Sequence, residues 1–200
     1  MKTEKILEKS EISRERIVEA AIALLNRQGI EKLTMRGLAG SLNIKAASLY
    51  WHIKDKQDLY DAIAEKMSSE IKPSCGLKDA RAYLLEAAAL YRKKLLEVRD
   101  SVEIFMHSAP VTPQRIELIK NIVICLLHLG IKEENCLIAG HLFNNYILSF
   151  TADEVIVQTE HKDAPNPFAG ILGTGYKPLN RDKQFLRGLE VLFAGFKILE

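Results

Sequence analysis

The stretch LTMRGLAGSLNIKAASLYWHIKDK, residues 33–56, contains the start and stop signals of two short helices. Thr34 is a good N-cap for the first helix, because its hydroxyl can accept a hydrogen bond from a free backbone N–H of the first turn. Asn43 follows where the chain needs a left-handed residue in order to turn, and Asn tolerates that conformation better than most residues. A second short helix then extends over about Lys45–His52 and is followed by Asp55, which can cap the next helix. The stretch therefore predicts two short helices joined by a tight turn.

The rest of the chain has the apolar spacing of helices. Before this stretch, apolar residues recur at intervals of three and four over 13–28, with Ser13 as the N-cap and Gly29 just after the end. After it, the same spacing continues in six further segments, and none of them alternates as a strand does. These segments are 55–71, 79–98, 101–108, 113–129, 133–157 and 181–199. Residues 161–180 hold three of the six prolines and predict a loop. The sequence therefore predicts an all-α fold.

Composition argues against several other classes of protein. The 200 residues are 48% hydrophobic, which is enough for a substantial core. No run of about 18 apolar residues is present and the first residues lack a signal-peptide pattern, so we expect a cytoplasmic protein with no membrane partner. The three cysteines and four of the five histidines lack the spacing of a disulfide framework or a metal site. They are Cys75, Cys125, Cys136, His107, His128, His141 and His161. We therefore predict no metal and no cofactor.

Positive charge is concentrated at the amino-terminal end. Residues 1–56 carry eleven Lys/Arg and seven Asp/Glu, whereas residues 57–200 carry seventeen and nineteen. This asymmetry permits a nucleic-acid-binding face at that end. We therefore divide the chain into a DNA-binding domain, 1–56, and a helical body, 57–200, with the helix 55–71 connecting them.

The second short helix has the residue types that a major groove requires. Its small first residues let the backbone approach base edges, and the polar-tipped aromatics and lysines that follow can reach phosphates on either side. For two residues a second interpretation stays open, because Leu49 and Trp51 can also be explained as core residues. The pair of short helices, preceded by a longer amphipathic helix, is the arrangement of a helix-turn-helix motif.

Residues 33–67, LTMRGLAGSLNIKAASLYWHIKDKQDLYDAIAEKM, resemble the DNA-binding domain of the tetracycline repressor (TetR) family. That family's pattern has a Thr-x-Arg-x-Leu-Ala start, a turn, and a Leu-Tyr-Trp-His recognition helix followed by a lysine. Residues 99–110 and 185–200 resemble the family's pocket segment and its last dimerisation helix. The resemblance implies two sets of DNA contacts. The base-reading set is Met35, Arg36, Lys45, Ala46, Ala47 and Ser48, and the phosphate set is Thr34, Tyr50, Trp51, His52 and Lys56.

Within the base-reading set, Arg36 is the expected reader of guanine. Its guanidinium fork matches the O6 and N7 atoms of that base, a contact worth about 1–3 kcal/mol of discrimination. This chain departs from the best-studied family members at Met35, Lys45, Ala46 and Ala47, so we expect a different operator sequence.

The resemblance also implies a body that binds a small organic effector. The predicted pocket residues are Lys72, Ala87, Tyr91, Phe105, Ser108, Pro110, Ile119 and Ile122. Family members that bind a tetracycline–magnesium chelate use two histidines, an Asn and a Gln, and the matching positions here are Lys72, Phe105, Ala87 and Ile122. Magnesium prefers oxygen ligands in octahedral geometry, and these side chains supply no anchor for it. We expect a flat or amphipathic effector, with Lys72 available for an acidic group. An alternative is that Phe105 and Ile122 fill the space and leave no pocket.

Two segments have wide apolar faces that could join two copies of the chain. One is 137–148, and the other lies on the last predicted helix. Its predicted interface residues are Phe185, Leu189, Leu192, Phe193 and Phe196. A four-helix interface would use both segments, and the alternative is that they are buried within one subunit.

These patterns predict a homodimeric transcriptional repressor that binds a palindromic, double-stranded DNA operator and is released by a small organic effector. Two nearby alternatives are a regulator that needs no ligand and an activator with the same DNA-binding domain. A small helical enzyme is a more distant alternative. It is disfavoured because the sequence has no paired carboxylates, nucleophile elbow or phosphate loop.

Overall fold

Four helices are described in the amino-terminal part, and three of them begin at the side-chain caps that the sequence predicts. The computed structural model describes residues 12–159, 171 and 179–200. Helices α1 (Arg14–Gln28), α2 (Met35–Ser41), α3 (Ala46–Leu49) and α4 (Lys56–Ser68) follow one another, with a short 3-10 turn, η1 (Ile30–Lys32), after α1. The N-cap side chains of α1, α2 and α4 accept hydrogen bonds from the backbone N–H three residues on, at 3.2, 3.0 and 2.8 Å. These caps are Ser13, Thr34 and Asp55.

The turn between α2 and α3 has the backbone conformation expected of it. Asn43 has a φ of 53°, in the left-handed region, and Gly29 ends α1 with a φ of 78°. Helix α3 is shorter than predicted, because it ends at Leu49 instead of continuing to His52. The chain turns there, and the N–H groups of His52 and Ile53 both bond to the Leu49 carbonyl at 2.9 Å. This turn buries Ile53 completely beside Leu49, so burial of an apolar side chain ends the helix early.

Helix α4 also ends earlier than predicted, at Ser68 instead of residue 71. The backbone N–H groups of Glu70 and Ile71 then donate to the Met67 and Ser68 carbonyls three residues earlier, at 3.2 and 3.0 Å. Pro73 disfavours a helical conformation for the residue before it, which prevents the helix from continuing.

In the part of the body that the structure describes, five helices of different lengths follow one another. They are α5 (Ala80–Glu97), α6 (Ser101–His107), α7 (Pro113–His128), α8 (Cys136–Thr159) and α10 (Arg181–Phe196), with 3-10 turns η2 (Glu133–Asn135) and η3 (Lys197–Leu199). The part of the chain that the structure describes contains no strand, which confirms the all-α prediction. Most of the loop predicted at 161–180, including His161, lies outside the described residues.

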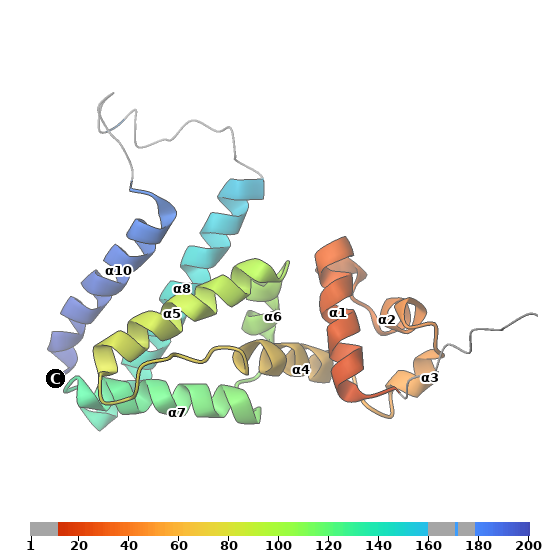
Figure 1. Cartoon of the computed structure of the whole chain (residues 1–200), viewed down its shortest axis with the longest axis horizontal. Coiled ribbons are helices and arrows are strands. Elements are labelled where there is room, and N and C mark those ends of the chain that lie inside the picture. The colour runs from red at the N-terminus through yellow and green to blue at the C-terminus, as the bar shows by residue number, and fades with distance from the viewer. Residues whose placement is uncertain (1–11, 160–170, 172–178) are drawn as a thin grey trace, which may run out of the picture.

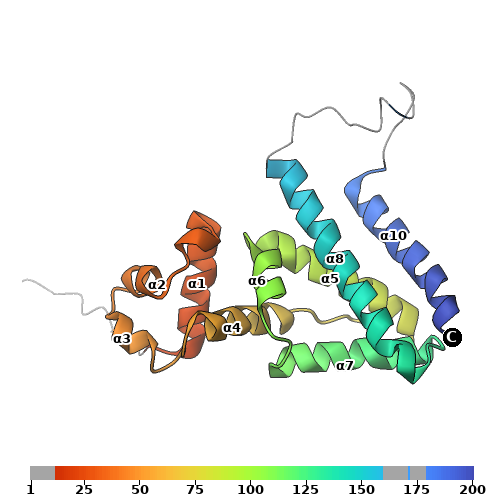
Figure 2. The same ribbon diagram turned by 180° about the vertical axis from the view of Figure 1, so that it is seen from behind.

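Helix α4 connects the two parts. It extends from α2 and α3 towards the body, while α8 and α10 lie side by side at the opposite end of the molecule (Figures 1 and 2). It packs against α1 on one side and against α6 and α7 on the other. Its apolar residues Leu59, Ile63 and Met67 are buried, as their spacing predicted, and the buried apolar side chains from α1 to α10 form one contiguous cluster. Among the described residues, no helix combines the length and apolarity needed to cross a membrane.

Candidate functional site

Most residues of the base-reading and phosphate sets lie at the surface of α2, α3 and the turn after α3. Thr34, Arg36, Lys45, Ala47, Tyr50, Trp51 and Lys56 are exposed, and Met35, Ala46, Ser48 and His52 are half-buried. For Leu49 and Trp51 the sequence left a core role as an alternative, and the structure gives the two side chains opposite degrees of exposure. Leu49 is completely buried, whereas 88% of Trp51 is exposed.

The exposure of Trp51 is unusual for so large an apolar side chain. Burial of a tryptophan in a core gains more free energy than that of almost any other residue, yet Trp51 packs against little, and the adjacent Tyr50 is 53% exposed. Two exposed aromatics next to exposed lysines form a surface that suits a polyanion, because rings and hydroxyls can pack on the sugar–phosphate backbone while the cations neutralise it.

An arginine on α1 fixes the end of α3 against α4. Arg14 donates through Nη1 to the His52 carbonyl at 2.7 Å, and through both terminal nitrogens to the Asp58 carboxylate at 3.2 and 2.5 Å. Asp58 also accepts from the Lys54 backbone N–H at 2.8 Å. The Arg14 hydrogen bond is the main cause of the lowered pKa of Asp58. Sequence reasoning missed Arg14, because its partners, the His52 carbonyl and the Asp58 carboxylate, are distant from it in the chain.

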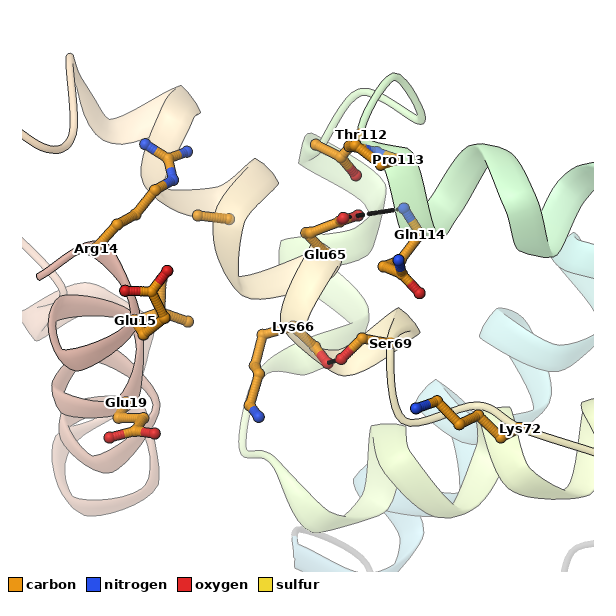
Figure 3. Close-up of a pocket in the computed structure, with 12 residues that line it drawn as sticks. Arg14, Glu15, Glu19, Glu65, Lys66, Ser69, Lys72, Thr112, Pro113 and Gln114 are labelled. Atoms are coloured by element: carbon orange, nitrogen blue, oxygen red, sulfur yellow. Dashed lines mark hydrogen bonds between the residues drawn. The ribbon is translucent and has the colours of Figure 1, made fainter.

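Two further carboxylates on the same face of α4 accept hydrogen bonds from the backbone of the helical body. Asp61 accepts from the Ala109 backbone N–H at 2.8 Å. Glu65 accepts from the backbone N–H of Gln114 at 2.9 and 3.0 Å, and from that of Arg115 at 3.3 Å. Glu65 therefore caps the first turn of α7, which its own N-cap residue does not do. Figure 3 shows Glu65 directed at Gln114.

The predicted pocket is filled by Arg115, a residue that sequence reasoning missed. Ala87, Tyr91, Phe105 and Ser108 are buried, and the Tyr91 and Phe105 ring centroids lie 5.1 Å apart. The Arg115 guanidinium lies 5.0 Å from the Phe105 centroid and donates to the Ser108 hydroxyl at 2.5 Å. The alternative in which Phe105 fills the space therefore describes this structure, with Arg115 added to it.

The other predicted pocket residues are spread over the surface. Ile122 is half-buried against the core, Pro110 and Lys72 are exposed, and 43% of Ile119 is exposed. The eight residues therefore do not line one of the described cavities, and two of the buried members, Phe105 and Ser108, are in contact with Arg115. Among the described residues, no group of three or more His, Cys, Asp or Glu side chains could hold a metal ion.

Two surface cavities lie beside α4 instead. The larger, about 630 Å³, lies between α1, α4 and the start of α7 and has both acidic and basic walls, including Glu15, Glu65 and Lys66 (Figure 3). The smaller, about 320 Å³, lies at the end of α4 and is lined by Tyr83 and Asn121 from α5 and α7. Burial raises the pKa of the Tyr83 phenol. Of the predicted pocket residues, only Lys72 lines these two cavities, and it lines both.

Helices α8 and α10 pack against each other through the residues that were predicted to form a dimer interface. Phe185, Leu189, Phe193 and Phe196 are buried within the subunit, and Leu192 is half-buried. Four of the five side chains are therefore covered within the subunit, as the alternative expected for this helix, and the dimer interface itself stays a prediction. Helical spacing showed that α10 has an apolar face but not that α8 of the same chain covers it.

Gly188 allows α8 and α10 to approach closely. A Cβ atom at this position would overlap the Tyr146 ring and its hydroxyl, and that hydroxyl donates to the Phe185 carbonyl at 2.8 Å. Other large apolar residues of the two helices remain exposed. They are Leu137, Ile138, Leu142, Val155, Ile156, Val157, Leu186 and Val191, and we call them the exposed apolar set.

Two short helices across an Asn43 turn, with exposed basic and aromatic side chains, define a helix-turn-helix transcriptional regulator. The family model described as bacterial regulatory proteins of the tetR family matches residues 17–63, and that of the tetracyclin repressor-like C-terminal domain matches residues 72–199. The chain belongs to the TetR family and is a transcriptional regulator, not an enzyme.

Individual relatives align with this chain over nearly its whole length. The class D tetracycline repressor of Escherichia coli is 29% identical over 202 residues, which cover 94% of this chain and 90% of the repressor. The crystal structure of TetR from Acinetobacter baumannii AYE is 26% identical, with a TM-score of 0.72 and coverage of 94% of this chain and 98% of that one. The structure of BioQ with its double-stranded DNA operator is 25% identical, with a TM-score of 0.73 and coverage of 93% and 98%.

Proposed function

We propose that this regulator is a homodimeric repressor that binds a palindromic operator and leaves it when a small organic effector binds to the body. The observation that carries the DNA-binding part is the exposed surface of α2, α3 and the following turn, above all Trp51 and Arg36. The operator complex of BioQ supports the same use of the fold. A repressor that binds chromosomal DNA acts in the cytoplasm of a bacterium, which is where we place this protein.

The base-reading and phosphate sets keep their assigned roles in this proposal. The Thr34 hydroxyl accepts a hydrogen bond as the cap of α2, and its own hydrogen stays free to donate to a phosphate oxygen. Helix α3 has only four residues, so its small side chains bring the backbone close to the bases. We retain the domain division of 1–56 and 57–200, because Asp55 caps α4 at that boundary.

The experiment that tests DNA binding is selection of bound sequences from a random duplex pool at a stated salt concentration. We expect a palindrome, since a two-fold dimer presents two recognition helices about 34 Å apart. The variant Arg36→Ala should relax the preference at one base position. By contrast, Lys56→Ala should weaken all duplexes alike and reduce the salt dependence. If no sequence is enriched, the protein does not read bases and the proposal fails.

We propose that the dimer forms through the exposed apolar set of α8 and α10. Exposed apolar side chains on two adjacent helices suit a four-helix interface between identical subunits. In sedimentation, Leu142→Glu combined with Leu186→Glu should give a folded monomer, because both side chains are exposed in the isolated subunit. The control Val111→Glu changes an apolar residue that is also exposed but lies outside these helices, and it should stay dimeric. A dimer that persists in the double variant would contradict this interface.

We propose that α4 transmits effector binding to the DNA-binding domain. Its carboxylates Asp58, Asp61 and Glu65 contact α1, the segment before α7 and α7 itself. A shift of the body would therefore move α4 and change the spacing of the two recognition helices, and the coupling must be reciprocal. We exclude tetracycline–magnesium as the effector, because Phe105 lies under a guanidinium cation and offers no metal ligand.

A second candidate is a repressor that needs no effector, and the filled pocket around Arg115 favours it. The two candidates differ in one measurement. Only an effector-controlled repressor releases its selected operator when a small molecule raises its thermal stability.

A further inference from the structure

The turn between α5 and α6 contacts the DNA-binding domain directly. The Asp100 carboxylate accepts a hydrogen bond from the Ile30 backbone N–H at 2.7 Å, and the Arg99 backbone N–H donates to Asn26 Oδ1 at 2.8 Å. We call these two hydrogen bonds the Asp100 contact. They join residues that are 70 and 73 positions apart in the chain, and the turn lies beside α1 in both views (Figures 1 and 2). The contact therefore links the DNA-binding domain to the body without passing through α4.

Asp100 has an unusual conformation for its position in the chain. Its φ of 57° lies in the left-handed region, which residues other than glycine adopt at a cost. Asp100 is also the N-cap residue of α6, a position where an aspartate usually accepts a hydrogen bond from the first turn of its own helix. In the described part of the chain its carboxylate does not cap α6 and bonds to Ile30 instead. Strained residues of this kind persist where the surrounding structure fixes them, and they cluster at functional sites.

Gly29 allows the end of α1 to approach this turn closely. A Cβ atom at Gly29 would lie 3.0 Å from Arg99 Nη2 and 3.1 Å from Asp100 Oδ2. The next residue, Ile30, is buried, and a buried backbone N–H requires an acceptor. The Asp100 carboxylate is that acceptor, so both sides of the contact depend on each other.

The Asp100 contact gives α1 a second attachment. At the start of α1, Arg14 bonds to Asp58 of α4, whereas the Asp100 contact involves the other end of the helix. The 15 residues of α1 span about 22 Å, so attachments at both ends fix the direction of this helix relative to the body. Because α2 packs against α1 and α3 packs against α2, the direction of α1 sets the orientation of the recognition helix.

We propose that the Asp100 contact determines the half-site spacing that the dimer accepts, because it fixes the orientation of each DNA-binding domain on its body. This inference rests on the proposed function, since spacing has a meaning only for a dimer on a palindromic operator. One added base pair moves a half-site by about 3.4 Å and turns it by about 35° around the duplex axis. A domain fixed to the body cannot follow that change, whereas a domain released from the contact can. Asp100 and Asn26 are thus positioning residues that act through the orientation of α3.

The test measures affinity for duplexes that differ only in spacing. Two copies of the selected half-site are placed at the selected spacing and at one and two base pairs more and fewer, and binding of the full-length protein is followed by fluorescence anisotropy at one salt concentration. The double variant Asn26→Ala, Asp100→Gly removes both hydrogen bonds without strain, because glycine tolerates a positive φ and alanine favours a helix. For one base pair, wild-type affinity should fall at least about tenfold, as for a mismatched base pair, and that of the double variant less than about threefold.

The matched control is Asp79→Gly, which removes a capping carboxylate from the opposite end of α5. It should keep the spacing preference of the wild type. At the selected spacing, the base preference should stay the same in all these proteins, because Arg36 and α3 are unchanged. This pattern distinguishes a positioning role from a general loss of stability, which would weaken binding to all spacings alike.

Three results would overturn the inference. They are a double variant that is as selective for spacing as the wild type, a wild type that binds all spacings equally, and a control that loses as much selectivity as the double variant. If the double variant folds poorly, Asn26→Ala alone replaces it and should lose part of the selectivity. A sequence pool that yields no palindrome refutes the proposed function, whereas a palindrome bound with unchanged spacing selectivity by the variants refutes only the role of the Asp100 contact.

Discussion

Replacement of Arg92 by Leu should be among the most destabilising single changes in the body. Arg92 on α5 forms two hydrogen bonds with the Glu154 carboxylate of α8, at 2.8 and 2.9 Å. Only 11% of the Arg92 side chain and 5% of the Glu154 side chain are exposed. Arg92 also pairs with Asp182 of α10 at 2.8 Å and lies 5.0 Å from the Phe185 ring centroid. One guanidinium thus joins three helices.

The expected loss of stability depends on the carboxylates that Arg92→Leu leaves without a cation. In Arg92→Leu the Glu154 carboxylate stays buried without a cation, and loss of one partner of a buried pair costs about 3–5 kcal/mol. Asp182 adds little to this cost, because its side chain is 78% exposed and stays hydrated. For a domain of this size, about 2–4 °C of melting temperature is lost per kcal/mol, so we expect a fall of about 6–20 °C. The double variant Arg92→Leu, Glu154→Leu should recover most of the loss, since it leaves no unpaired charge.

The assay is thermal and urea unfolding followed by circular dichroism at one fixed protomer concentration, because dimer stability depends on concentration. The control Lys93→Leu removes the neighbouring cation, which is 69% exposed and pairs weakly with Glu97 at 3.9 Å. It should change stability by less than about 1 kcal/mol. The reasoning is refuted if Arg92→Leu costs less than about 1 kcal/mol, or if the double variant is no more stable than the single one.

Three further changes test local features. Asp58→Asn should destabilise the protein by about 1 kcal/mol at neutral pH through loss of the charge-assisted bonds to the half-exposed Arg14. Because the folded pKa of Asp58 is lowered, this contribution is complete above the ordinary Asp pKa of about 3.9 and is lost as the pH falls through the folded value. The wild-type and variant unfolding free energies should therefore converge in acid, and a constant difference would contradict the assignment. Gly188→Ala should cost about 1–3 kcal/mol in urea unfolding by overpacking against Tyr146, and a neutral result would mean that α8 and α10 separate easily. Asn43→Ala should lower the melting temperature because its φ of 53° strains an alanine, while Asn43→Gly should not.

Features that depend on residues close together in the chain were predicted correctly from the sequence. The caps Ser13, Thr34 and Asp55 each bond to a group three residues away, and Asn43 adopts the positive φ that its turn requires. Such features are readable because both partners of each interaction lie within one or two turns of the chain. Helix ends that depend on tertiary burial could not be predicted from the sequence, as the early end of α3 shows.

Residues that are distant in the chain determine which side chains fill the predicted pocket and which helix covers the apolar face of α10. Arg115 reaches Ser108 and Phe105 from a different helix, and a long flexible cation in α7 gave no sequence signal that it would enter an aromatic site. The apolar face of α10 was visible in the spacing, but its partner was not. Whether α8 of the same chain or of a second copy covers Phe185 depends on the close approach that Gly188 permits.

Three acidic residues on one face of α4 connect this helix to both parts of the molecule. Asp58, Asp61 and Glu65 are spaced three and four residues apart, so they lie on one face of the helix, and from the sequence alone they resemble a solvated stripe. In the structure each accepts hydrogen bonds from a different segment: the Arg14 guanidinium, the Ala109 amide and the first turn of α7. Because Arg14 and Asp58 are partly exposed, we expect their contact to contribute about 1 kcal/mol, which lies within the range of typical allosteric coupling free energies, about 1–3 kcal/mol. If the proposed effector binds to the body, moving α4 together with these partners should cost less free energy than breaking their hydrogen bonds, and we expect the DNA-binding domain, held to α4 by Arg14, to move with it.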